Sequence, residues 1–290
     1  MHGGSSPLTA SAPHEQLHVQ PCATEEGIHV STPLKHGDFT SLAEDYSKYR
    51  EGYAPSVVSA LIGLLGGSAE ACDAVDVGAG TGIWSRMLAE AGFRSVTAVD
   101  PNDTMRATGK RDSAHHGITW RAGSGEDTGL ATASADLVTM ASSFHWVDFH
   151  KGTKEFSRVL RPGGWFVALW NPRYIQASPL LTDIEAELDR LKPDMKRVSS
   201  ARQGLMDELS DRLAASEHFD DVILLEGRHE VQQTIDQYIG VWRSVNDVRV
   251  QLGEEKFEQF LDYARRRIGD AETVQTTYLT RAWAARRVSA

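Results

Sequence analysis

Short apolar runs alternate with longer amphipathic segments through the first two thirds of the chain. The runs are rich in β-branched residues and are bounded by turn residues, which is typical of buried strands. Five such strands are expected, at residues 74–79, 95–100, 118–123, 135–142 and 163–170. Helical spacing of apolar residues predicts helices before and between them, at about 41–65, 81–92, 101–117 and 148–160. Strands that alternate with helices and are apolar almost throughout predict an α/β fold with a doubly wound, mostly parallel sheet.

The alternation breaks after Trp170. Two helical segments, 178–192 and 200–216, follow each other without a strand between them, and we expect them to form a helical cap inserted at about 172–217. A strand at 219–231, helices at 234–245 and 254–269, and a final antiparallel edge strand at 273–288 complete a predicted seven-stranded sheet.

The first 36 residues differ from the rest of the chain. They are rich in Ser, Pro, Gly, Ala and His and show no helical or strand period, which predicts a flexible arm. Five of the eleven histidines lie there, at spacings that match no metal-ligand pattern, so no metal is expected. Residues 37–290 are then predicted to form one domain.

Composition narrows the class of protein. An apolar fraction of 41% and a charged fraction of 24% are ordinary for a folded globular protein. The net charge of −10 disfavours binding to nucleic acid or to an anionic membrane. The chain has two cysteines, no apolar stretch of about 20 residues and no signal-peptide pattern, which favours a cytoplasmic protein. We expect a monomer or a homodimer.

The candidate chemistry lies in DAVDVGAGTGIWSRML, residues 73–88. Gly78, Gly80 and Gly82 stand between a strand and a helix, where a dinucleotide or another nucleoside cofactor can approach the backbone. The dinucleotide fingerprint fails by one position, because Ile83 stands where its last glycine would fall. Asp100, at the end of the next strand, suits ribose hydroxyls in either class. Asp76, immediately before the loop, would repel a pyrophosphate and suit an ammonium or sulfonium group.

Several motifs in order resemble class I S-adenosylmethionine-dependent methyltransferases. They are DVGAGTG, VTAVDPNDTM, GSGEDTGLATASADLVTMASSFHWVD and EFSRVLRPGGWFVALWN, which together cover about residues 40–175. YSKYREGYAP and FHW are similar to a small-molecule subgroup of trans-aconitate methyltransferase-like proteins. The chain departs from the pattern at Ser124, where many members place an aspartate.

The resemblance implies a Rossmann-like methyltransferase fold, S-adenosylmethionine as cofactor and a small-molecule methyl acceptor. The implied cofactor-binding residues are Tyr49, Arg50, Asp76, Gly78, Ala79, Gly80, Asp100, Pro101, Met105, Ser124, Gly125, Glu126, Ala141 and Ser142. The candidate acceptor-binding residues are Tyr46, His145, Trp146, Trp170, Arg173, Tyr174, Tyr238, Trp242 and Arg243. Aromatic groups with a few arginines suit an apolar or aromatic metabolite, with a carboxylate as one possible partner of the arginines.

Methyl transfer is an in-line displacement that chiefly requires alignment of acceptor, methyl group and sulfur. His145, just past the fourth strand, is the candidate catalytic residue, as a general base or as a group that orients the acceptor. The sequence leaves open whether oxygen, nitrogen, sulfur or carbon is methylated. Two other functions remain open, a non-catalytic cofactor-binding regulator or scaffold and a nicotinamide-dependent dehydrogenase.

Overall fold

The computed structural model describes residues 42–66, 68–196 and 205–289, so the predicted arm of residues 1–36 lies outside the described residues. The elements are α1 (Ala43–Tyr49), α2 (Pro55–Leu64), η2 (Ala69–Ala71), β1 (Asp73–Val77), α3 (Ile83–Glu90), β2 (Ser95–Val99), α4 (Asp103–Asp112), β3 (Thr119–Arg121), β4 (Ala135–Ala141), η3 (Phe144–Trp146), α5 (Phe149–Val159), β5 (Leu160–Trp170), η4 (Ile175–Ala177), α6 (Pro179–Leu191), α7 (Leu205–Ala214), β6 (Phe219–Thr234), α8 (Ile235–Arg243), α9 (Asn246–Ile268) and β7 (Thr273–Arg287). None of the described helices is both long and apolar enough to cross a bilayer.

The strands form one seven-stranded sheet in the order β3-β2-β1-β4-β5-β7-β6. Strands β1 to β5 are mutually parallel, whereas β7 runs antiparallel to both β5 and β6. The predicted α/β class is confirmed. The sequence predicts the final strand at the edge of the sheet, but β7 lies between β5 and β6, and β6 forms the edge.

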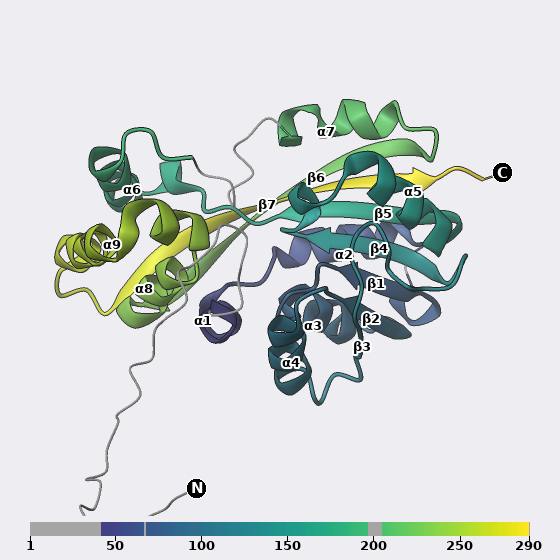
Figure 1. The fold of residues 1–290 in the computed structure, drawn as a ribbon, viewed down its shortest axis with the longest axis horizontal. Coiled ribbons are helices and arrows are strands. Elements are labelled where there is room, and N and C mark those ends of the chain that lie inside the picture. The colour runs from purple at the N-terminus through teal and green to yellow at the C-terminus, as the bar shows by residue number, and fades with distance from the viewer. Residues whose placement is uncertain (1–41, 67, 197–204, 290) are drawn as a thin grey trace, which may run out of the picture. The chain divides into compact units, whose positions relative to one another are not determined.

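Helices cover both faces of this sheet (Figure 1). Alternate residues of β5 point to opposite faces, as the strand period requires. Val167 and Leu169 pack in a cluster with residues of α2 and α3, and Phe166 and Ala168 pack in another with residues of α5 and α7. This two-sided burial explains why the β5 sequence is apolar without alternation.

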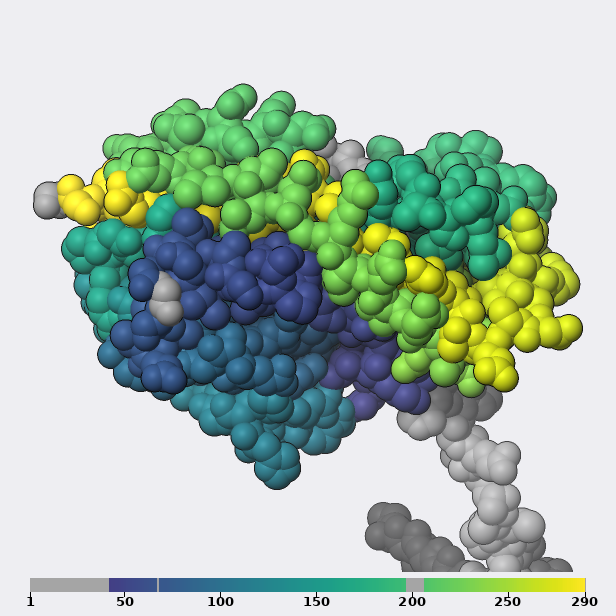
Figure 2. All heavy atoms as spheres, turned by 180° about the vertical axis from the view of Figure 1, so that it is seen from behind, coloured from purple at the N-terminus to yellow at the C-terminus, as the bar shows by residue number. Residues whose placement is uncertain are grey.

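Strands β6 and β7 extend beyond the rest of the sheet. They pair from Phe219 opposite Arg287 to Thr234 opposite Thr273, but β5 pairs with β7 only from Arg281 to Arg286. The extension leads into α8 and α9, which together with α6 enclose a separate apolar core. We call α6, α8 and α9 the cap. Figure 2 shows the other side, where α2 lies against the β6 surface.

The second helix of the predicted 172–217 cap lies elsewhere. Leu209 and Leu213 of α7 are fully buried in the cluster on the sheet face that α5 covers, and Trp283 Nε1 of β7 donates to Ser210 Oγ at 3.1 Å. The amphipathic spacing of α7 therefore indicated an apolar face correctly, but α6 alone of the two helices joins the cap.

Candidate functional site

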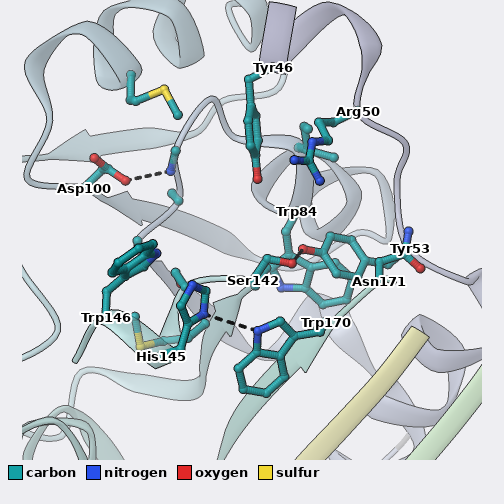
Figure 3. A pocket seen from close by; sticks show the side chains of 18 of the residues that line it. Tyr46, Arg50, Tyr53, Trp84, Asp100, Ser142, His145, Trp146, Trp170 and Asn171 are labelled. Atoms are coloured by element: carbon teal, nitrogen blue, oxygen red, sulfur yellow. Dashed lines mark hydrogen bonds between the residues drawn. The ribbon is translucent and has the colours of Figure 1, made fainter. Parts of the chain in front are cut away.

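A cavity of about 430 Å³ lies at the carboxyl ends of the central strands. The loops after β1, β2, β4 and β5 line it, and α1, α6, α8 and β7 add further walls. In Figure 3 the Tyr46 ring points into the cavity from the side opposite His145 and Trp170, with Asp100 at one end. Ligands of open parallel sheets bind at this edge, where adjacent loops diverge.

The glycine loop and Asp100 form one end of the cavity. Gly78, Gly80 and Gly82 have φ of 66°, 57° and 78°, a left-handed region that favours glycine. Gly80 N donates to Asp100 Oδ2 at 2.8 Å, and Asn102 N donates to Asp100 Oδ1 at 2.8 Å. Burial raises the pKa of Asp100, which is 7% exposed. The carboxyl group is thereby fixed between the loop and the start of α4.

Asp76 lies beneath the loop and does not line the cavity. Its side chain is fully buried, Ser85 Oγ donates to its Oδ2 at 2.6 Å, and Thr139 Oγ1 lies 3.3 Å from its Oδ1. Burial raises the pKa of Asp76 to about 7. The described contacts of Asp76 are to α3 and β4, and its direct contact with a cofactor stays a prediction.

The turn at 124–126 forms a second wall. Ser124 Oγ accepts from the amides of Glu126 and Asp127, both at 3.2 Å, and Glu126 Oε1 accepts from Asp148 N at 3.0 Å. A Cβ on Gly125 would lie 2.4 Å from Val147 Cγ2, so this position has room only for glycine. These contacts hold the turn against the start of α5.

Ser142 directly follows β4 and has a left-handed conformation, with φ of 55°. Its amide donates to Leu169 O at 2.7 Å, and its hydroxyl lies 2.9 Å from the Tyr53 hydroxyl. Such a conformation is costly for a residue other than glycine, and these two bonds hold it. The chain beyond Ser142 is thereby directed across the cavity toward His145.

His145 lies between two indole rings. Trp170 Nε1 lies 3.4 Å from His145 Nδ1, and the rings of His145 and Trp146 have centroids 4.6 Å apart. Burial lowers the pKa of His145 to about 4, so the ring is neutral at pH 7. An indole nitrogen can only donate, so Nδ1 accepts and the ring proton resides on Nε2. That Nε2 is buried and lacks a hydrogen-bond partner among the described residues.

Arg173 and Tyr278 line the end of the cavity beyond β5. Arg173 Nη2 pairs with Glu185 Oε1 at 3.2 Å, and its guanidinium lies 3.7 Å from the centre of the Trp242 ring. Glu51 accepts from Gln233 Nε2 at 3.0 Å, and burial raises the pKa of Glu51. In the described part of the chain, no three His, Cys, Asp or Glu side chains form a group that could hold a metal ion.

The cavity brings together most residues that the sequence selected. They are Tyr46, Arg50, Gly78, Ala79, Gly80, Asp100, Pro101, Met105, Ser124, Gly125, Glu126, Ala141, Ser142, His145, Trp146, Trp170 and Arg173. They come from six separate stretches of chain, which only the fold places side by side.

Six predicted residues do not line it: Tyr49, Asp76, Tyr174, Tyr238, Trp242 and Arg243. Tyr238 and Trp242 are 1% and 0% exposed within the cap core, and the cavity side of α8 presents Val241 instead. Tyr49 packs against Gly240, where a Cβ would lie 2.4 Å from its ring.

Tyr174 and Arg243 contact charged side chains outside the cavity. The Arg228 guanidinium covers the Tyr174 ring at 4.3 Å, and Arg243 pairs with Glu258 at 2.9 Å. Of the two arginines Arg173 and Arg243, the first therefore lines the cavity and the second forms an ion pair outside it.

Sequence reasoning missed several polar residues of the cavity, namely Glu51, Tyr53, Asn102, Ser143, Asn171, Glu185 and Tyr278. Glu51 and Tyr53 stand inside the YSKYREGYAP motif, so their neighbours already signalled them. Glu185 and Tyr278 have no such signal, because only the cap and the long β7 bring them to β5.

Comparison with known proteins identifies the central segment. A family model described as "Methyltransferase domain" matches residues 75–168. Residues 75–168 are thus similar to a methyltransferase domain. The matched segment runs from β1 to β5 and includes the glycine loop, Asp100, the 124–126 turn and His145.

Curated relatives match parts of the chain. An uncharacterized methyltransferase of Mycobacterium tuberculosis is 35% identical over 139 residues, which cover 47% of this chain and 52% of that protein. A ubiquinone/menaquinone biosynthesis C-methyltransferase of Rubrivivax gelatinosus is 39% identical over 97 residues, covering 33% of this chain and 38% of that protein. The chain therefore spans about half the length of the mycobacterial protein and 38% of the length of the Rubrivivax protein.

Solved structures share the architecture around the methyltransferase domain. A protein of Anaeromyxobacter dehalogenans, provisionally described as a type II methyltransferase, has a TM-score of 0.60 and 26% identity, covering 83% of this chain and all of that one. A protein of Anabaena variabilis, provisionally assigned as a methyltransferase of an antibiotic biosynthesis pathway, has a TM-score of 0.50 and 19% identity over 78% of this chain and 96% of that one. The fold is thus the Rossmann-like methyltransferase fold.

Proposed function

We propose that the chain transfers a methyl group from S-adenosylmethionine to a small-molecule acceptor. The observation that carries this proposal is the cavity that joins Asp100 and the glycine loop, within a methyltransferase domain, to a second end lined by His145, Trp170 and Arg173. When bound, S-adenosylmethionine supplies a methyl group on a positively charged sulfur. The narrower likeness to trans-aconitate methyltransferase-like proteins stays a prediction.

The residues at the loop end suit this cofactor. Each oxygen of Asp100 accepts one backbone amide, which leaves lone pairs for ribose hydroxyls. Met105 and the 124–126 turn offer the adenine an apolar contact and backbone groups. The guanidinium of Arg50, which already donates to Ser244 Oγ at 2.9 Å, is the candidate partner of the cofactor carboxylate.

His145 is assigned to orienting the acceptor. Because its Nδ1 accepts from Trp170, its Nε2 carries a proton and can donate to the acceptor. A neutral ring in this tautomer has no free lone pair on the unpartnered nitrogen, so it holds the acceptor rather than removing a proton from it. Of the two roles that the sequence left open for His145, this geometry supports orientation.

Titration calorimetry tests the proposal. We expect binding of S-adenosylmethionine and of S-adenosylhomocysteine, with no binding of NAD. Asp100→Ala should weaken cofactor binding by about 1 to 3 kcal/mol, because charge-assisted hydrogen bonds are lost. Asp103→Ala is the matched control, since the Asp103 side chain is 92% exposed on α4. Tighter binding of NAD than of S-adenosylmethionine would refute the proposal.

A further inference from the structure

Two buried polar atoms at the acceptor end of the cavity lack a hydrogen-bond partner within the described part of the chain. They are Arg173 Nη1 and the Tyr278 hydroxyl oxygen. The Arg173 side chain is 10% exposed, and Tyr278 is 5% exposed. A buried polar group without a partner costs about 1 to 3 kcal/mol. A ligand that accepts hydrogen bonds at this place would remove that cost.

The two groups can meet the same ligand atom or group. Arg173 and Tyr278 are directly opposite each other in an isolated antiparallel bridge. Side chains of directly opposed residues project to the same face, with Cβ atoms about 4.5 to 5.5 Å apart. Both side chains also line the same cavity.

Neighbouring groups hold both side chains in place. Glu185 and the Trp242 ring fix the Arg173 guanidinium, while the His229 ring stacks on Tyr278 with centroids 5.5 Å apart and an interplanar angle of 22°. Burial raises the pKa of Tyr278, so its hydroxyl keeps its proton and can donate. The pair is therefore a preorganised set of donors.

The charges around the pair favour an anion. Glu185 balances Arg173, whereas Arg50 donates to the hydroxyl and carbonyl oxygens of Ser244, both neutral partners. Burial raises the pKa of Glu51, another acidic group at this end of the cavity. S-adenosylmethionine itself adds a net charge of one positive unit from its ammonium, carboxylate and sulfonium groups. The sulfonium lies beside the acceptor, so a negatively charged acceptor gains a favourable interaction with it.

The pair stands well away from the cofactor end. Asp100 follows β2 and Arg173 follows β5, and the sheet order places β1 and β4 between those strands. Three strand spacings of about 4.8 Å separate the two ends by roughly 14 Å. Donors at this distance from the ribose end face the space left for the methyl acceptor.

We propose that Arg173 and Tyr278 form a recognition site for a carboxylate group on an apolar or aromatic methyl acceptor. The carboxylate accepts from Arg173 Nη1 and from the Tyr278 hydroxyl, while the body of the acceptor lies against Trp170 and reaches toward His145. This inference rests on the proposed function, since it names the acceptor class of the same cavity.

The test compares acids with their uncharged amides. Benzoate, phenylacetate and 3-phenylpropionate, each beside its amide, are titrated into the full chain with and without S-adenosylhomocysteine. At least one acid should bind about tenfold more tightly than its amide. Tyr278→Phe should weaken that acid about tenfold, as expected for a lost hydrogen bond to a charged group, and should leave S-adenosylhomocysteine binding unchanged.

Tyr238→Phe is the matched control, because Tyr238 is another buried tyrosine that lies in the cap core outside the cavity. It should leave acid binding unchanged. Tyr278→Phe keeps the ring that stacks on His229, and its melting temperature is measured alongside; weaker acid binding at an unchanged melting temperature cannot be attributed to unfolding.

The inference is overturned if no acid binds more tightly than its amide, or if Tyr278→Phe binds the acids as the wild type does. Failure of S-adenosylhomocysteine to bind would instead overturn the proposed function. In that event the titrations without it still decide whether the donor pair recognises a carboxylate.

Discussion

Replacing Asp76 with asparagine tests whether burial keeps a proton on the carboxyl group beneath the glycine loop. The side chain is fully buried, and its pKa is raised to about 7, chiefly because burial penalises the charged form. Asparagine has nearly the same shape and retains an oxygen that can accept from Ser85 Oγ, which lies 2.6 Å from the Asp76 carboxylate. The substitution therefore removes the titration with little change in packing.

The expected magnitude follows from the difference in pKa between the folded and unfolded chain. An unfolded aspartate has a pKa of about 3.9, and each unit of difference is worth about 1.36 kcal/mol. Because the folded pKa is raised, the contribution to stability is complete below about pH 4 and is lost as the pH rises through about 7. Between pH 5 and pH 8 this loss amounts to about 2 to 3 kcal/mol.

Urea unfolding followed by tryptophan fluorescence, at pH 5 and at pH 8, measures the loss. The free energy of unfolding of the wild type should fall by about 2 to 3 kcal/mol more than that of Asp76→Asn between the two conditions. Asp270→Asn, at an exposed position before β7, is the control and should follow the wild type. Identical pH dependence in the wild type and Asp76→Asn would mean that Asp76 stays ionised when buried, and the reasoning from burial would be wrong.

Substitutions at two further positions, His145 and Gly125, test the site. His145→Ala should lower the turnover of an identified acceptor about 10²-fold, and His145→Gln should lower it less, since glutamine can still donate a hydrogen bond. Cofactor affinity should stay unchanged in both variants. If wild-type turnover shows an inflection near pH 7 that both variants lose, His145 acts as a base instead. Gly125→Ala should weaken cofactor binding in calorimetry and cost about 1 to 3 kcal/mol in thermal unfolding, because its Cβ would lie 2.4 Å from Val147 Cγ2. Gly63→Ala in α2 is the control, because a Cβ at this position would meet nothing within 4 Å. Its free energy of unfolding should rise by up to about 1 kcal/mol. An equal loss of stability in both variants would contradict the packing argument.

Local pattern predicts the elements of this fold better than their lateral order. The alternation of Val274, Thr276 and Tyr278 indicates a strand with one buried face, but it says nothing about which strands flank it. A sequence signal for an internal strand is present further along, in the apolar run Ala282–Ala285, all four residues of which are buried. A continuous apolar run of this kind is typical of a strand covered on both faces.

The candidate site divides in the same way. The loop end could be predicted because the glycine loop, Asp100 and the 124–126 turn directly follow apolar strands that the sequence reveals. The acceptor end could not, because aromatic residues suit a pocket and an apolar core equally well. On α8, Tyr238 and Trp242 share the face that packs in the cap, whereas Val241 lines the cavity.

The two ends of the cavity rest on different parts of the chain. Loops after β1 and β2 form the Asp100 end, whereas α6, α8 and the extended β7 supply Glu185, Val241 and Tyr278 to the other. Under the proposed function, evolutionary change confined to the second set can alter which acceptor fits while the cofactor end keeps its geometry. A library of variants restricted to cap residues and the end of β7 would accordingly sample new acceptors without rebuilding the nucleotide site.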